Sequence, residues 1–272
     1  MSAPAARRRV LAVRGADRRT RRDSLAGEEP MEVRVTGPAG TTDAVAVTMR
    51  TPGDDFELAA GFLVTEGVIV PGTVSRVAYC DDVEREEQRF NIVTVRTSGP
   101  VTLGADRAHA MTSACGICGT TSLDAVEVRC AALPPGPVVS EAALLAMPDR
   151  LREGQRVFDS TGGLHAAGLF DADGRLLLVR EDVGRHNAVD KVIGAAALAG
   201  DLPLHDRALV VSGRAGFEIV QKAAVAGIAV LAAVSAPSSL AADAAERLGM
   251  TLVGFLRGDG YNVYCGAERI VD

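Results

Sequence analysis

Aromatic residues are scarce in this 272-residue chain, and tryptophan is absent. Phe and Tyr make up only 4% of the residues although 47% are hydrophobic. A core with so few rings must be filled by Ala, Val and Leu, which favours the closely packed layers of an α/β fold. The chain is long enough to bury a sizeable core, either as one large domain or as two unequal ones.

Long hydrophobic runs and a surplus of positive charge are also missing. No stretch of about 18 apolar residues occurs, and the Arg-rich start lacks the apolar segment of a signal peptide. We therefore expect a cytoplasmic protein that is neither secreted nor inserted in a membrane. The formal net charge of -6 argues against a broad grip on nucleic acid, which needs an excess of Lys and Arg. A local basic pocket for one small anion is compatible with this charge.

Cysteine and histidine are too few and too scattered for a disulfide framework or a zinc site. The five cysteines are an odd, unevenly spaced set: Cys80, Cys115, Cys118, Cys130 and Cys265. No second CxxC and no His-x3-His pair completes a four-ligand zinc site. The zinc deaminase pattern needs Glu two residues after a His and Pro before the first Cys of a CxxC. Here the residue two positions after His165 is Ala167, and the residue before Cys115 is Ala114. We therefore predict no metal.

Residues 27–108 predict a small α+β domain. The segments MEVRVTG and TDAVAVTMR alternate apolar and polar residues around a Gly-Pro-Ala-Gly turn, which predicts a β-hairpin. A helix with Asp54 as its cap should follow in DFELAAGFLVTEGVI. Two more strands are expected in VSRVAYC and FNIVTVRT. Residues 1–26 are Arg-rich and are expected to form a poorly ordered tail, with a nucleic-acid-binding arm as the weaker alternative.

Residues 121–272 predict a larger layered α/β domain, joined to the first by an exposed loop over 109–120. Strands without polar alternation are separated by helical segments, which is typical of a parallel sheet that is buried on both faces. The segments in chain order are RLLLVRED, VDKVIGAAALAG, ALVVSGR, FEIVQKAAVAG, IAVLAAVS, SLAADAAERLG and TLVGFLRG.

Polar and Gly-rich turns follow the strands of this sheet. Ligands of open α/β sheets bind beyond the carboxyl ends of the strands, and Arg214 and Arg257 there could hold a phosphate. A nucleotide-like ligand therefore fits this edge. The turns are Glu181-Asp182, Ser212-Gly213-Arg214, Ser235-Ala236-Pro237-Ser238 and Arg257-Gly258-Asp259-Gly260.

Two further segments leave their roles open. The run EDVGRHNAVDK, residues 181–191, packs six ionisable side chains into eleven positions, which indicates either a structural ion-pair cluster or a ligand site. His165 follows the polar segment FDSTGGL and is either a proton donor or a buried imidazole. Cys80, Cys130 and Cys265 are interpreted as packing residues or inert thiols.

The loop Cys115-Gly116-Ile117-Cys118 is the sharpest chemical feature. Two thiols at this spacing can exchange a disulfide, share a soft metal, or activate one another as nucleophiles. The glycines beside each cysteine and the lack of a helix signal behind them argue against a thioredoxin-like site. A persulfide carrier needs only one accessible cysteine on a flexible segment, and this loop meets that requirement.

Several long motifs in register resemble the FdhD/NarQ family, the sulfurtransferases that serve formate dehydrogenases. The resemblance runs from about Glu28 to the C-terminus. Its segments are EEPMEVRV, TPGDDFELAAGFLVTEGVI, CGICG, FDSTGGLHAAGLF, EDVGRHNAVDKVIG, SGRAGFEIVQKAAVAGI, SAPSSLA and GFLRGDGYNVY.

This resemblance implies a function and a set of site residues. The protein is expected to take sulfur from a cysteine desulfurase as a Cys115 persulfide, with Cys118 as the second thiol. It would deliver the sulfur to the molybdenum bis(guanine dinucleotide) cofactor before insertion into formate dehydrogenase. Family members are similar in forming homodimers, and their larger domain resembles the cytidine-deaminase fold. The residues implied in cofactor binding are Phe255, Leu256, Arg257, Gly258, Asp259 and Gly260.

A non-catalytic chaperone is the rival hypothesis. Such a protein would bind the guanine nucleotide end of the cofactor, and the cysteines would serve only as contacts or metal ligands. The strand-end residues Ser212, Gly213 and Arg214 would then matter together with Arg257. Loading of sulfur onto Cys115 distinguishes the two hypotheses.

Overall fold

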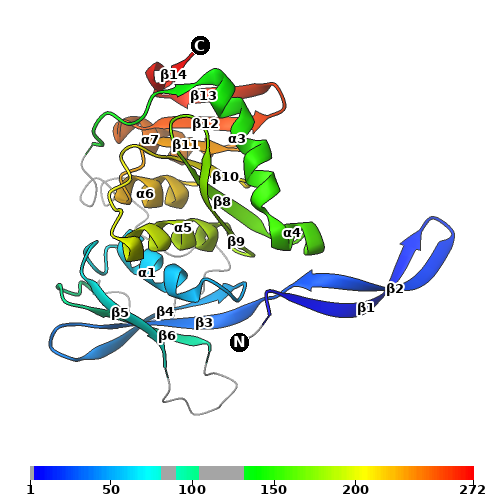
Figure 1. Ribbon diagram of the computed structural model, residues 1–272, viewed down its shortest axis with the longest axis horizontal. Helices are drawn as coiled ribbons and strands as arrows, with labels where there is room; N and C mark the ends of the chain where they lie inside the picture. Colours follow the sequence, from blue (N-terminus) through cyan, green and yellow to red (C-terminus); the bar gives the residue numbers. More distant parts are fainter. Residues whose placement is uncertain (1–2, 81–89, 104–131) are drawn as a thin grey trace.

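The computed structural model describes residues 3–80, 90–103 and 132–272 (Figure 1). A four-stranded sheet has the order β4-β3-β6-β5, and a six-stranded sheet has the order β13-β12-β11-β10-β8-β9. Helices α1 and α5 lie between the two sheets in Figure 1. Among the described residues, no helix is long and apolar enough to cross a membrane.

The four-stranded sheet and α1 confirm the elements predicted in the first part of the chain. Strands β3 and β4 form the expected antiparallel hairpin, and α1 packs its buried side chains on the sheet. The elements are β3 (Glu29–Thr36), β4 (Thr42–Arg50), α1 (Asp55–Thr65), β5 (Val74–Tyr79) and β6 (Ile92–Thr97). The cap prediction was wrong in one respect: Asp54 is at the N-cap but makes no side-chain capping bond. Its carboxylate instead lies 3.6 Å from the guanidinium of Arg180.

The six-stranded sheet confirms the predicted strand-helix alternation, but it is mixed rather than purely parallel. Strands β10, β11 and β12 run parallel, while β8 pairs antiparallel with both β10 and β9, and β13 pairs antiparallel with β12. The strands are β8 (His165–Phe170), β9 (Leu176–Asp182), β10 (Ala208–Val211), β11 (Val230–Ala233), β12 (Thr251–Arg257) and β13 (Gly260–Cys265). A two-stranded pair, β7 (Val139–Ser140) with β14 (Ile270–Val271), accompanies the sheet.

Helices cover both faces of this sheet, as its continuous apolar strands predict. Leu209 and Val211 of β10 face a core that includes side chains of three helices, whereas Ala208 and Val210 face a core shared with α3. Helices α5, α6 and α7 therefore cover one face, and α3 covers the other. The helices are α3 (Glu141–Gly154), α4 (Arg156–Thr161), α5 (Arg185–Ala199), α6 (Phe217–Val225) and α7 (Ser239–Arg247).

Two glycines let α1 and α5 touch backbone to backbone. A Cβ added at Gly194 would overlap the carbonyl oxygen of Glu57, and one at Gly61 would overlap the carbonyl oxygen of Asp190. Only residues without a side chain permit this approach. The turns before α1 and α5 are consequently brought together, and this junction positions one side of the candidate site.

The Arg-rich start forms a hairpin where a poorly ordered tail was predicted. Strand β1 (Ala5–Arg14) pairs antiparallel with β2 (Asp17–Ala26) along its whole length. The ribbon projects away from both sheets in Figure 1. Gly15 takes a positive φ of 59° at the turn, a conformation that glycine adopts without strain. The deaminase-like fold and the domain boundaries at 108 and 121 stay predictions, and the 109–120 loop lies outside the described residues.

Candidate functional site

Four strands of the large sheet end at one edge, as the sequence predicts. β10, β11 and β12 are parallel, and β9 shares their direction because both β9 and β10 are antiparallel to β8. The carboxyl ends at Asp182, Val211, Ala233 and Arg257 therefore lie on the same side of the sheet. β8 begins at that edge with His165, which is paired with Asp182. We call this set of strand ends and their following turns the strand-end edge.

The turn Ser212-Gly213-Arg214 is fixed against the start of β8. The Ser212 backbone amide donates to the Ala166 carbonyl at 2.9 Å, and the Ala166 amide donates to the Ser212 hydroxyl at 2.9 Å. A Cβ on Gly213 would lie 3.2 Å from Nδ1 of His165, which is tighter than ordinary van der Waals contact. Glycine here lets the imidazole pack on the backbone, while the exposed Arg214 side chain follows directly.

His165 is held in its neutral form. Burial lowers the pKa of the imidazole first, and electrostatic interactions with Arg185, His186 and Arg214 lower it further, against an opposing effect of Asp182. A neutral imidazole has one nitrogen able to accept a proton and one able to donate a hydrogen bond. The ring is only half-buried, so the interpretation of His165 as a buried imidazole holds in part, and a role as a proton donor stays a prediction.

Arg185 supplies an unused donor at the same place. It is the first residue of α5, and its Nε is buried with no hydrogen-bond partner among the described residues. A helix N-terminus also presents free amides and a partial positive charge. The neighbouring His186 is engaged: its Nε2 lies 2.9 Å from Glu218, and this hydrogen bond lowers the pKa of the Glu218 carboxyl. Arg185 is thus free to meet an anion, and the sequence did not single it out from its charged neighbours.

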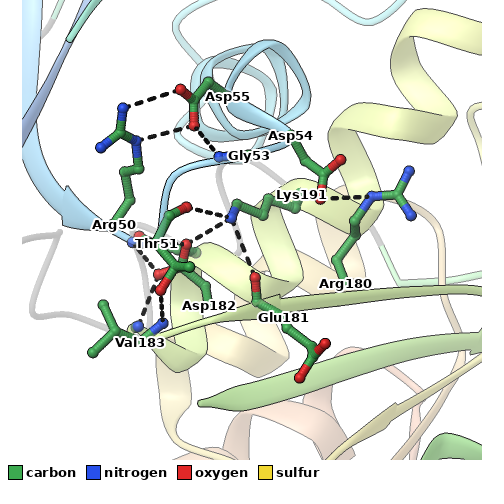
Figure 2. Close-up of polar contacts among 12 residues, drawn as sticks. Arg50, Thr51, Gly53, Asp54, Asp55, Arg180, Glu181, Asp182, Val183 and Lys191 are labelled. Atoms are coloured by element: carbon green, nitrogen blue, oxygen red, sulfur yellow. Dashed lines mark hydrogen bonds and ion pairs between the residues drawn. The ribbon is translucent and has the colours of Figure 1, made fainter. Parts of the chain in front are cut away.

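The remainder of the 181–191 run is structural. Asp182 and Lys191 are fully buried and form an ion pair at 2.8 Å between Oδ2 and Nζ. Figure 2 shows this pair reaching across to Thr51 in the turn before α1. Lys191 donates to the Thr51 carbonyl at 3.0 Å and to the Glu181 carbonyl at 3.2 Å. Asp182 accepts the Thr51 amide at 3.1 Å. The interpretation of the run as a structural ion-pair cluster is confirmed for Asp182 and Lys191, and a ligand-binding role for other residues of the run stays a prediction.

Two more buried ionic clusters flank this junction, and sequence reasoning missed both. Arg50 makes two 3.0 Å hydrogen bonds to the Asp55 carboxylate, which also accepts the Tyr79 hydroxyl. Burial and the Asp55 charge raise the pKa of Tyr79 to about 12. Lys222 of α6 lies 2.9 Å from Asp190. All of these groups have partners, so they stabilise the fold and offer no free ligand-binding group.

The stretch Phe255–Gly260 lies at the strand-end edge, where β12 ends and turns into β13. Phe255 has a φ of 55°, a strained conformation for a residue with a side chain, and its amide donates to the Ser235 carbonyl at 3.1 Å. The guanidinium of Arg257 lies 5.8 Å from the Phe255 ring centroid, within cation–π range. Residues 257–260 are exposed, whereas Leu256 is fully buried in the core. Leu256 therefore supports the turn and its side chain cannot contact a ligand.

The predicted catalytic thiols, Cys115 and Cys118, lie outside the described residues, and their role stays a prediction. Cys265 is half-buried, its thiol donates to the Met250 carbonyl at 3.3 Å, and burial raises its pKa. A thiol held protonated is a poor nucleophile, which agrees with the interpretation of Cys265 as inert. Within residues 3–80, 90–103 and 132–272, no three His, Cys, Asp or Glu side chains gather as a metal site.

Comparisons with known proteins agree over nearly the whole chain. A sequence model described as the FdhD/NarQ family matches residues 26–271. A Streptomyces coelicolor protein named Sulfur carrier protein FdhD is 52% identical over 273 residues, which cover 97% of this chain and 95% of that one. A Mycobacterium tuberculosis protein of the same name is 51% identical over 261 residues, covering 92% of this chain and 93% of its own.

A solved structure shares the fold. The crystal structure of a proposed formate dehydrogenase accessory protein from Desulfotalea psychrophila superimposes with a TM-score of 0.75 and covers 98% of this chain and 99% of its own. The two sequences are 24% identical, so the likeness concerns the fold alone.

Proposed function

The chain belongs to the FdhD/NarQ family, and from this premise we propose that it is a sulfur carrier whose reactive thiol is Cys115. The donor is a cysteine desulfurase, and the acceptor is the molybdenum bis(guanine dinucleotide) cofactor destined for formate dehydrogenase. The transfer takes place in the cytoplasm, and the carrier works as a homodimer. The observation that carries the proposal is family membership over nearly the full chain, together with a basic strand-end edge suited to a nucleotide.

The proposed reaction has two group transfers. The Cys115 thiolate attacks the terminal sulfur of the donor persulfide, the donor S–S bond breaks, and the donor cysteine leaves as a thiolate. Cys115 then carries the sulfane sulfur as its own persulfide. Attack of the Cys118 thiolate on the Cys115 sulfur releases the outer sulfur as hydrosulfide to the cargo and leaves a Cys115–Cys118 disulfide. A dithiol reductant restores both thiols for the next cycle.

The strand-end edge supports the cargo part of the proposal. Arg185, Arg214 and Arg257 provide cationic donors, and the start of α5 provides backbone amides. Gly213 and the neutral His165 leave a surface with no fixed negative charge at the turn itself. Pyrophosphate oxygens need donors of this kind. The half-buried Phe255 ring and the exposed Arg257 guanidinium beside it provide a flat surface on which a guanine base can stack.

Intact-protein and peptide mass spectrometry test the carrier function directly. After incubation of the wild-type protein with a cysteine desulfurase and cysteine, we expect a reducible gain of one sulfur, about 32 Da, mapping to the peptide with Cys115, since an accessible thiolate reacts with the donor persulfide. Added sulfur that maps only to Cys80 or Cys265, or no gain at all, would overturn the assignment.

Arg185→Gln is expected to weaken GDP binding by at least about tenfold, because one charge-assisted hydrogen bond contributes roughly 1.5–3 kcal/mol. Isothermal titration calorimetry with GDP measures the change. Arg207→Gln is the matched control: it removes the same charge from the residue before β10, at the opposite edge of the sheet. Equal weakening by both variants would show a general charge effect and contradict a site at Arg185.

A cofactor-binding chaperone is the second candidate. It is favoured by one observation, that the cationic groups at the strand-end edge are the arginines Arg185, Arg214 and Arg257, which can bind a nucleotide without thiol chemistry. Under this alternative, GDP binding and the Arg185→Gln effect remain, while the sulfur gain on Cys115 is absent. The two measurements above therefore separate the candidates.

A further inference from the structure

The hairpin of β1 and β2 concentrates positive charge on a protein that is otherwise acidic. Residues 5–26 contain eight arginines and two aspartates. The remaining residues of the chain contain 21 basic and 33 acidic side chains. A ribbon with a formal charge of +6 thus projects from a body with a formal charge of -12, a separation that marks the hairpin as an electrostatic contact surface.

The pairing register divides these charges between two unequal faces. Residues directly opposite in an antiparallel pair share a face, and faces alternate along each strand. Both aspartates lie on one face, where Arg19 pairs with Asp17 at 2.9 Å and Arg21 pairs with Asp23 at 3.2 Å. The other face has four exposed arginines and no acidic residue. Its arginines are Arg7, Arg9, Arg18 and Arg22. We call it the open face.

The open face is unfavourable in the isolated protein. Arg9 is directly opposite Arg22, and like charges in that position destabilise a strand pair. Leu11 and Val13 on the same face are 59% and 51% exposed. A two-stranded ribbon alone is at best marginally stable in water. An acidic partner would relieve the repulsion and cover the two apolar side chains, so the hairpin is better suited to a bound than to a free state.

The base of the hairpin is next to the strand-end edge. β2 packs against α4, and a Cβ on Gly163 would lie 3.3 Å from the Cβ of Ala26. Gly163 is two residues before His165, which lies at the edge itself. A protein bound to the hairpin would therefore lie beside the surface that is proposed to bind the cofactor.

We propose that the open face is the docking surface for an acidic patch on the enzyme that receives the cofactor. The inference rests on the proposed function for the identity of the partner. Two apolar side chains among four arginines match the apolar centre and charged rim of a protein interface. Nucleic acid fits less well, since the body of the protein carries a large negative charge that repels phosphates. A second copy of this chain is the competing acidic protein.

Two charge-matched variants test the proposal with the full-length protein. The open-face variant carries Arg7→Gln, Arg9→Gln, Arg18→Gln and Arg22→Gln. The opposite-face variant carries Arg8→Gln, Arg14→Gln, Arg19→Gln and Arg21→Gln, so both lose four charges. Binding to apo formate dehydrogenase from the same organism is measured by biolayer interferometry at low and high salt. We expect the open-face variant to bind at least about tenfold more weakly with little salt dependence, and the opposite-face variant to stay within about threefold of wild type.

Several outcomes would overturn the docking proposal. They are failure of the wild type to bind the dehydrogenase, unchanged binding by the open-face variant, and equal loss in both variants. Loss of self-association or of duplex DNA binding in the open-face variant, with dehydrogenase binding retained, would assign the face to another partner. Persulfide formation on Cys115 and GDP binding are measured in parallel. Both are expected to be unchanged in the two variants, and a wild type that docks but carries no sulfur would contradict the proposed function alone.

Discussion

Cys115→Ala is expected to abolish both sulfur loading and the formate dehydrogenase activity that depends on it. Removal of the nucleophile from a covalent transfer leaves no site for the intermediate, and comparable deletions lower rates by more than about 10³-fold. The persulfide is measured by intact mass after reaction with a cysteine desulfurase and cysteine. Formate dehydrogenase activity is measured in cells whose only copy of the carrier is the variant.

Cys265→Ala is the matched control for this change. The Cys265 thiol has a raised pKa because it is buried, and it donates to the Met250 carbonyl, so its loss should leave sulfur loading unchanged. Cys118→Ala is expected to load sulfur but to release it slowly, because the resolving thiol is missing. Thermal unfolding of each variant excludes a folding defect. Sulfur loading at the wild-type level in Cys115→Ala would refute the assignment of that thiol.

The sequence was a good guide wherever one local pattern determined one element. Strands β10, β11 and β12 are short apolar runs between helical segments, and such runs are buried on both faces of a parallel sheet. Their carboxyl ends therefore meet at one edge whatever the neighbouring strands do. This is why the predicted ligand edge, with Ser212–Arg214 and Arg257–Gly260, is recovered from the pattern alone.

Relations between distant segments were not predictable in the same way. β8 lies between β9 and β10 and, together with β13, makes the sheet mixed, although nothing in its own sequence specifies that position. The backbone contact at Gly61 and Gly194 joins residues on different helices, and each glycine alone looks like a weak point in a helix. The charge density of residues 1–26 predicts a poorly ordered tail, whereas residues 5–26 form a hairpin whose pairing the composition does not reveal.

The 181–191 run shows how helix phase decides between two interpretations. Asn187, Asp190, Lys191 and Gly194 have the i, i+3, i+4 and i+7 spacing of one helix face. In the structure the three polar side chains are buried, and this face meets α1 and the turn before it. Arg185, in the first turn of α5, is not part of this face and lies next to the strand-end edge. The sequence shows the spacing, but it does not show that α1 and the turn before it bury this polar face.

Lys191→Met is expected to lower the free energy of unfolding by about 3–5 kcal/mol, because removal of one partner from a buried ion pair leaves an uncompensated charge. Asp182 and Lys191 have side-chain exposures of 0% and 1%. The ammonium also bridges the Thr51 and Glu181 carbonyls, as Figure 2 shows. The loss therefore affects the junction between the two sheets. Urea denaturation followed by circular dichroism measures the change.

Two further variants show whether the unpaired Asp182 carboxylate is the cause. In the double variant Asp182→Asn/Lys191→Met the buried charge is gone, while an amide oxygen can still accept a hydrogen bond from Thr51 or Gly184. We expect it to be more stable than Lys191→Met alone. Arg175→Met breaks a surface ion pair with Asp171 whose arginine side chain is 76% exposed, and such pairs contribute at most about 1 kcal/mol. A double variant less stable than Lys191→Met would mean that the charge is not decisive, and that the carboxylate hydrogen bonds to Thr51, Gly184 and Asn187 hold the junction without help from the ammonium.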